Sequence, residues 1–168
     1  MRISAKRMAT CSMMVTLSVV LMLLGAVLEL GIYACPMFVG LCFIPVGQKY
    51  GRMYHIVLYV ATGILCFLLV PNVEENLMFV GLFGWYPIVR PALQKMPRFL
   101  RWIVKLLTFN VAIIAVEWLV MAVFIPEVVV DALLWVLLIL GNIVFFLYDF
   151  LIPKMDVIVK RFDERHFI

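Results

Sequence analysis

Long apolar runs alternate along this chain with short polar or charged connections. The runs cover residues 9–30, 36–46, 56–70, 77–89, 102–125 and 132–152. Each run is continuously apolar and does not alternate between polar and apolar positions, which excludes a transmembrane β-barrel and indicates membrane-spanning helices. The pattern predicts an all-α polytopic membrane protein with six transmembrane helices, in a single domain that covers residues 1–168.

The charges in the connections predict the orientation of the helices. Basic residues lie before the first run and after the second, fourth and sixth runs, whereas the connections 71–76 (PNVEEN) and 126–131 (PEVVVD) contain carboxylates and no Lys or Arg. Lys and Arg are enriched in the cytoplasmic loops of membrane proteins. We therefore expect a multi-pass protein of the cell membrane with both termini in the cytoplasm and the two acidic connections outside.

Two of the runs allow a different interpretation. The run 36–46 is short for a hydrocarbon core of about 30 Å, but as a re-entrant hairpin it would place Lys49 and Arg52 outside, so we expect it to cross.

The first run follows a basic N-terminus, as in a signal peptide, and IYAC at 32–35 resembles a lipoprotein cleavage site. This run is too long, and Glu29 interrupts the expected cleavage region, so we expect an uncleaved helix.

Composition supports this class and excludes several functions. Hydrophobic residues make up 67% of the chain and the mean hydropathy is +1.15, too apolar for a soluble domain. The net charge of +4 does not indicate nucleic-acid binding, because the cations lie at the ends of apolar runs. The sequence contains no CxxC motif and no pair of neighbouring histidines, so it predicts no metal or other cofactor. The runs contain no Ser-His, paired Asp, HExxH or Cys-His constellation, so we expect no enzyme.

Polar residues inside or beside the runs are the candidates for a binding site. An ionisable side chain in hydrocarbon costs several kcal/mol unless it faces a cavity or a partner. The residues predicted to line a substrate-binding pocket open to the exterior are Glu29, Tyr33, Asn72, Glu74, Glu75, Trp85, Asn110, Glu117 and Asn142. Such an acidic and aromatic lining favours a small cationic or amine-bearing molecule.

Most of these residues also have a purely structural interpretation. The carboxylates Glu29, Glu74 and Glu75 would cost little free energy if they were solvated at the outer interface. Asn110 and Asn142 suit a hydrogen bond between helices. Glu117 is harder to explain in this way, because it lies well inside the run 102–125.

One further carboxylate suggests a structural ion pair at the inner end. Asp149 lies in the inner third of the last run, and Arg90 and Lys105 lie at the inner ends of theirs. We expect Asp149 to pair with Arg90 or Lys105.

Small residues mark one face of the first helix. Ala5 and Ala9, then Ser12 and Thr16, follow small-xxx-small spacing, which lets another helix approach closely. That helix belongs either to this chain or, if the face points outward, to a partner subunit.

The layout resembles the substrate-binding S components of energy-coupling factor (ECF) transporters. The resemblance rests on six helices in 168 residues, on the small residues Ala5 and Ala9 in a basic N-terminal helix, and on polar residues in 102–125, 132–152 and the outer connections. It implies a protein that binds a vitamin or other micronutrient and docks onto a transmembrane coupling subunit driven by two cytoplasmic ATPases. The family commonly covers its substrate with a longer first loop than GIYAC, so PNVEEN would serve as the lid.

Two functions therefore remain open from the sequence. The first is a solute-binding subunit of a micronutrient transporter without its own motor, since the chain has no Walker loop. The second is a small structural or assembly subunit of a larger membrane complex, with no ligand of its own. A binding protein should have a pocket lined by Glu117, whereas a scaffold should pair its buried polar groups with one another.

Overall fold

The computed structural model describes residues 5–28, 33–124 and 131–165, and every element among them is helical. The elements are α1 (Ala5–Leu28), α2 (Ala34–Cys42), α3 (Ile44–Tyr50), α4 (Arg52–Leu69), α5 (Val73–Met78), the π-helical turn η1 (Phe79–Phe83), α6 (Tyr86–Leu93), α7 (Arg98–Phe124) and α8 (Asp131–Arg165). The all-α prediction is confirmed for this part of the chain.

Among the residues that the structure describes, four helices are long and apolar enough to cross a membrane. These segments are Ala5–Leu28, Arg52–Leu69, Arg98–Val120 and Leu138–Val159. The chain is therefore suited to a membrane-embedded protein. The other two apolar runs are also helical, but each is broken, the first into α2 and α3 and the second into α5, η1 and α6.

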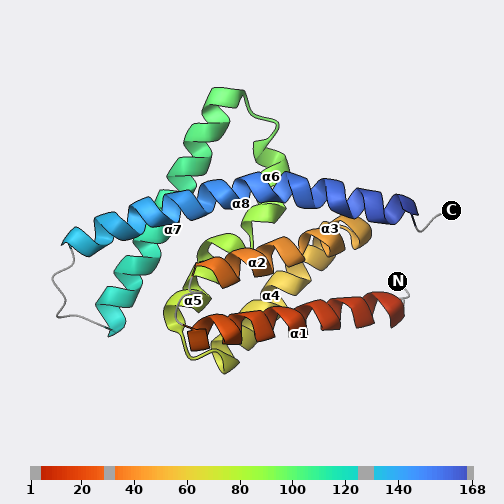
Figure 1. The fold of residues 1–168 in the computed structure, drawn as a ribbon, viewed down its shortest axis with the longest axis horizontal. Helices are drawn as coiled ribbons and strands as arrows, with labels where there is room; N and C mark the ends of the chain where they lie inside the picture. Colours follow the sequence, from red (N-terminus) through yellow and green to blue (C-terminus); the bar gives the residue numbers. More distant parts are fainter. Residues whose placement is uncertain (1–4, 29–32, 125–130, 166–168) are drawn as a thin grey trace.

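The break between α2 and α3 bends the chain without reversing it. Pro45 lies in the first turn of α3, where a missing backbone N–H is tolerated. Figure 1 shows α2 and α3 following one another toward the end where α1 begins. The chain turns back only at Gly51, whose φ of 97° suits glycine, and α4 begins at the next residue.

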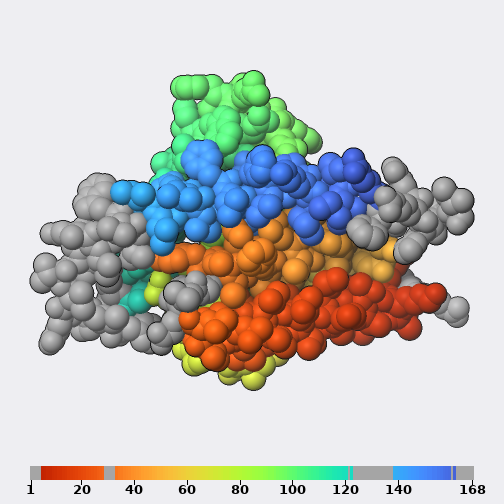
Figure 2. Space-filling model, in the orientation of Figure 1, coloured from red at the N-terminus to blue at the C-terminus, as the bar shows by residue number. Residues whose placement is uncertain are grey.

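The broken segments form the centre of the molecule and the long helices surround them. Figures 1 and 2 show α2 and α3 between α1 and α8, while α7 crosses α8 steeply. Large apolar side chains are exposed on all four long helices, whereas the side chains of η1 and α2 are mostly buried. Irregular backbone at membrane depth is tolerated where protein covers it, which explains this arrangement.

Two buried clusters hold the centre together. One packs η1 and α6 against α7 and α8, with the rings of Phe109 and Phe145 stacked at a centroid distance of 4.4 Å. The other packs α2 and η1 against α1 and α4, where Phe43 meets Phe79 edge to face. These aromatic side chains hold the helices together by close van der Waals packing.

Side chains satisfy the carbonyl groups of η1 and its neighbours. Pro87 cannot donate to the carbonyl of Phe83 four residues earlier, and the Tyr148 hydroxyl donates to that oxygen instead, at 2.8 Å. The Tyr59 hydroxyl donates to the Val80 carbonyl at 2.8 Å. In the same way, Pro153 cannot donate to the carbonyl of Asp149, which accepts a bond from Arg90 instead.

The last helix is longer than the sequence suggested. The apolar run ends at residue 152, but α8 continues through Pro153 to Arg165. We attribute the continuation to Arg90, which bonds the carbonyl that Pro153 leaves without a helical partner. The beginning of α1 and the end of α8 lie at the same end of the molecule (Figure 1).

The close packing of α2 against η1 gives a testable prediction. A Cβ at Gly40 would lie 2.3 Å from the Tyr148 hydroxyl and 2.5 Å from the Phe83 carbonyl oxygen. We expect Gly40→Ala to destabilise the protein by about 1–3 kcal/mol, because the backbone of η1 would have to move. Thermal unfolding in detergent measures the effect.

Gly63→Ala is the matched control in another helix interior. A Cβ at Gly63 would lie 3.4 Å from a methyl carbon of Val80, an ordinary contact. Because alanine favours helix over glycine, we expect no loss of stability. Equal melting temperatures for the two variants would contradict the packing described for α2.

Candidate functional site

A group of carboxylates gathers at the end of the molecule where α2 and α5 begin. The Tyr33 hydroxyl lies 3.2 Å from Oε1 of Glu74 and 3.1 Å from Oε1 of Glu117. We call these three residues the carboxylate cluster. A hydroxyl carries one proton, so it donates to only one of the two oxygens at a time. The cluster therefore holds two carboxylates close together with a single donor between them.

Three elements position the cluster. Tyr33 immediately precedes α2, Glu74 lies in the first turn of α5, and Glu117 lies in α7 with only 4% of its surface exposed. The two ion pairs found between described residues lie elsewhere, at Asp149. The negative charge of this cluster is therefore not balanced by a Lys or Arg in the part of the chain that the structure describes.

Two asparagines fix the segment that presents Glu74. The Asn72 side chain caps α5 by accepting a bond from the backbone N–H of Glu75 at 3.1 Å. The Asn76 amide donates to the Val70 carbonyl at 3.0 Å. Asn72, predicted to line the pocket, thus has a structural task in the described chain.

Glu75 lies next to the cluster but is fully buried. Neither of its carboxylate oxygens has a hydrogen-bond partner among the described residues. It packs against α1, where a Cβ at Gly25 would lie 2.3 Å from Oε1 of Glu75. The interpretation that Glu75 is solvated at the interface is therefore wrong. Burial raises the pKa of Glu75, which precedes the apolar run 77–89, to about 7.

The remaining predicted pocket residues have partners of their own or lie outside the described residues. Asn110 and Asn142 bond one another between α7 and α8 at 3.0 and 3.4 Å, and each also donates to a carbonyl of its own helix. The Trp85 indole donates to the Gly81 carbonyl at 2.7 Å. Glu29 lies outside the described residues.

The predicted docking residues all point outward. Ala5, Ala9, Ser12 and Thr16 are exposed on α1, and the two hydroxyls donate to carbonyls of the same helix. Ser12 and Thr16 also line a largely apolar groove of about 790 Å³ between α1 and α4. The intramolecular helix partner is therefore not seen in the described chain, and this face remains free for another protein or for lipid.

Near the middle of α8, Asp149 is the centre of a buried ion-pair network. Its carboxylate accepts bonds from Lys105 at 2.6 and 2.8 Å, from Arg90 at 3.1 Å and from the Tyr86 hydroxyl at 2.8 Å. The expected ion pair of Asp149 is confirmed, with both cations present together. We call Arg90, Lys105 and Asp149 the charge triad.

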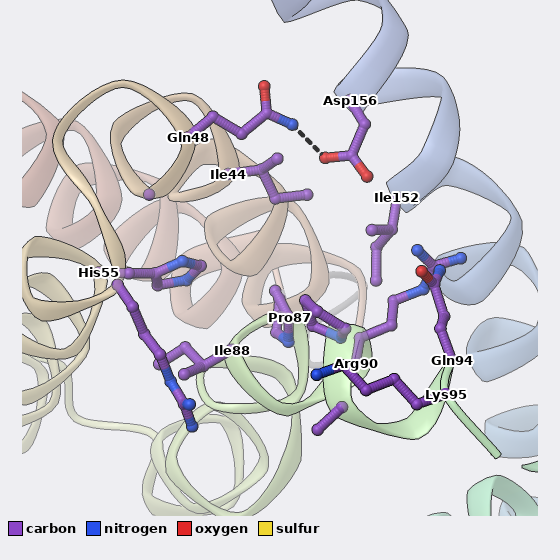
Figure 3. Close-up of a pocket in the computed structure, with 14 residues that line it drawn as sticks. Ile44, Gln48, His55, Pro87, Ile88, Arg90, Gln94, Lys95, Ile152 and Asp156 are labelled. Carbon is purple, nitrogen blue, oxygen red and sulfur yellow. Dashed lines mark hydrogen bonds between the residues drawn. The ribbon is translucent and has the colours of Figure 1, made fainter.

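A cavity near the charge triad could not be predicted from the sequence. A cavity of about 350 Å³ opens between α3, α4, α6 and α8, and Arg52, His55, Arg90 and Lys95 are among its lining residues (Figure 3). In the sequence alone, Arg52, Arg90 and Lys95 indicate only the orientation of the helices. The clustering of basic residues after the second and fourth runs was the signal available.

Chemical patterns and comparisons give no further assignment. Among the described residues, no group of three or more His, Cys, Asp or Glu side chains is arranged to hold a metal ion. Comparison with protein-family models, with curated proteins and with solved structures finds no match to this chain.

The buried carboxyl of Glu75 predicts a pH-dependent stability. Its pKa in the folded protein, about 7, lies above the ordinary value of 4.5, so the folded state binds the proton more tightly. Stability should therefore fall as pH rises from about 5 to 8, by roughly 2–3 kcal/mol in total. Glu75→Gln should remove most of this dependence, measured as melting temperature against pH.

Glu74→Gln is the matched control one residue earlier. Glu74 is only half-buried, so this change should leave the loss of stability between pH 5 and 8 in place. If Glu75→Gln shows the same pH dependence as the unaltered protein, the buried carboxyl is not its source.

Proposed function

We propose that this chain is a membrane-embedded, S component-like subunit that binds a small cationic or amine-bearing solute at the carboxylate cluster. The observation that carries the proposal is the meeting of Glu74 and Glu117 at the single hydroxyl of Tyr33. Two carboxylates so placed repel one another unless a proton or a cation lies between them.

An ammonium group is chemically suited to this position. It carries three donors and one positive charge, so it can donate hydrogen bonds to both carboxylates at once. The Tyr33 hydroxyl can still donate to either carboxylate. Each charge-assisted bond contributes about 1.5–3 kcal/mol. The low exposure of Glu117 strengthens this attraction, because less water competes with the solute.

The proposal includes six membrane crossings with both termini in the cytoplasm and the carboxylate cluster toward the exterior. Its support is the separation of charge between the two ends of the molecule. Figure 1 shows the start of α1 and the junction of α3 with α4 at one end, and α5 toward the other. The first two contain Lys6, Arg7, Lys49 and Arg52, whereas the first turn of α5 contains Glu74. The positive-inside rule assigns the basic end to the cytoplasm.

A subunit of this kind needs partners to move its solute. We propose that a transmembrane coupling subunit, driven by separate ATPases, docks on the exposed small residues of α1. The groove beside Ser12 and Thr16 supports this assignment, because small residues let a second helix approach closely.

A structural or assembly subunit is the second candidate. The mutual bonds of Asn110 and Asn142 favour it, because amides that satisfy one another act as links between helices. Glu117 also lines neither the cavity beside the charge triad nor the groove on α1. The same exposed face of α1 would then hold the protein in its complex.

A binding experiment separates the two candidates. Purified protein in nanodiscs is titrated with primary amines and with neutral analogues of the same shape, and melting temperature and native mass spectra are recorded. We expect amines to raise the melting temperature, and Glu117→Gln to weaken their binding about tenfold or more, through the loss of a charge-assisted bond.

Glu164→Gln, in the last turn of α8, is the matched control. We expect it to leave amine binding unchanged. If no amine binds, or if Glu117→Gln binds as tightly as the unaltered protein while remaining folded, the structural subunit is the better assignment.

A further inference from the structure

The cavity at the basic end of the molecule has the chemistry of an anion site. It lies between α3, α4, α6 and α8 and has a volume of about 350 Å³, within the range of small-molecule pockets. Three cationic side chains line it, Arg52, Arg90 and Lys95, against one carboxylate, that of Asp156. That carboxylate accepts a hydrogen bond from Gln48 across the mouth of the cavity (Figure 3).

The charge triad beside the cavity has more positive than negative charge. Arg90 and Lys105 both bond Asp149, and the three residues are only 8%, 4% and 8% exposed. Two buried cations thus share one carboxylate. The face of Trp102 lies 5.3 Å from the Lys105 ammonium and offsets a small part of the surplus. A buried charge without a counter-ion is strongly destabilising, so a site for an anion next to Arg90 is expected.

His55 supplies a separate observation that points to a ligand. The side chain is 6% exposed, and its Nε2 has no hydrogen-bond partner among the described residues. Figure 3 shows the imidazole ring directed into the cavity from α4, opposite Pro87 and Ile88. Buried polar atoms in proteins are nearly always bonded, so the unpaired nitrogen of this residue, which lines the cavity, indicates a missing partner.

We propose that this cavity binds a phosphate group. Arg90 and Arg52 offer planar guanidinium donors, Lys95 an ammonium, and His55 one further nitrogen. They come from α4, from α6 and from the connection after α6. This is the donor set that suits the tetrahedral oxygens of a phosphate. The ligand is a phosphate ester of net negative charge, carried either by an anionic lipid headgroup or by a soluble molecule, since basic pockets between membrane helices hold anionic lipid headgroups.

The site does not depend on the solute proposed for the carboxylate cluster, which lies at the other end of the molecule. Its test therefore uses different probes. Protein in neutral detergent is titrated with inorganic phosphate and with glycerol 3-phosphate, and melting temperature is recorded. In parallel, protein is reconstituted in nanodiscs of phosphatidylcholine alone or with phosphatidylglycerol, and native mass spectrometry reports the lipids that it retains.

We expect phosphate-bearing ligands to raise the melting temperature, and Lys95→Ala to weaken binding about fivefold to tenfold through the loss of one charged donor. His55→Gln should weaken it as well. Because His55 is buried and its replacement can impair folding, the exposed Lys95 keeps the test decisive. The matched control is Lys154→Ala, an exposed lysine of α8 over the Phe150 ring and outside the cavity.

Each outcome assigns or overturns the site. Binding of the soluble phosphates that Lys95→Ala weakens and Lys154→Ala does not assigns a soluble phosphate ester. Retention of phosphatidylglycerol with the same dependence, in the absence of soluble binding, assigns a lipid headgroup. If neither probe distinguishes the unaltered protein from Lys95→Ala, or if Lys154→Ala has an equal effect, the cavity is not a phosphate site.

Discussion

The satisfaction of backbone carbonyls by side chains is the constraint on which the arrangement of this protein depends. Pro87, in the first turn of α6, and Pro153, inside α8, each leave a carbonyl without its helical donor. The Tyr148 hydroxyl bonds the carbonyl of Phe83, and the Arg90 guanidinium bonds that of Asp149. In a membrane no water replaces such donors, so η1 and α6 must lie against α8. The position of the broken segments at the centre follows from this requirement.

Arg90 therefore has two tasks at once. It bonds the carbonyl that Pro153 leaves free and pairs with the Asp149 side chain. The same residue thereby fixes α6 against α8 and places a cation beside the cavity. The charges differ at the carboxylate cluster. There Glu74 and Glu117 meet at Tyr33, and neither forms an ion pair with a Lys or Arg of the described residues. The described residues thus place two carboxylates together at one end of the molecule and several cations around a cavity toward the other.

Much of the fold could be predicted from the sequence, because apolar runs and charged connections act locally. The helical runs, the partner of Asp149 and the alternative interpretation of Asn110 and Asn142 all follow from residue type and depth. The breaks were not predicted in detail, since a π-helical turn has no clear signature beyond the glycines and Pro87 around it.

The sites were harder to predict, because they depend on contacts between distant parts of the chain. The burial of Glu75 is set by the close approach of Gly25, and sequence alone left this carboxyl equally consistent with solvent. The basic cavity joins residues near 50, 90 and 156. Until these helices are placed together, His55 is a lone histidine near an interface, and its unpaired nitrogen cannot be recognised.

The π-helical turn η1 sets the direction in which the side chains of α6 point. A π-helix rotates less per residue than an α-helix, so regular α-helical winding of the same residues 79–83 would rotate α6 by about one residue's advance, about 100°. The guanidinium of Arg90 would then face away from α8. The unwound turn is therefore what directs this arginine to its carboxylate.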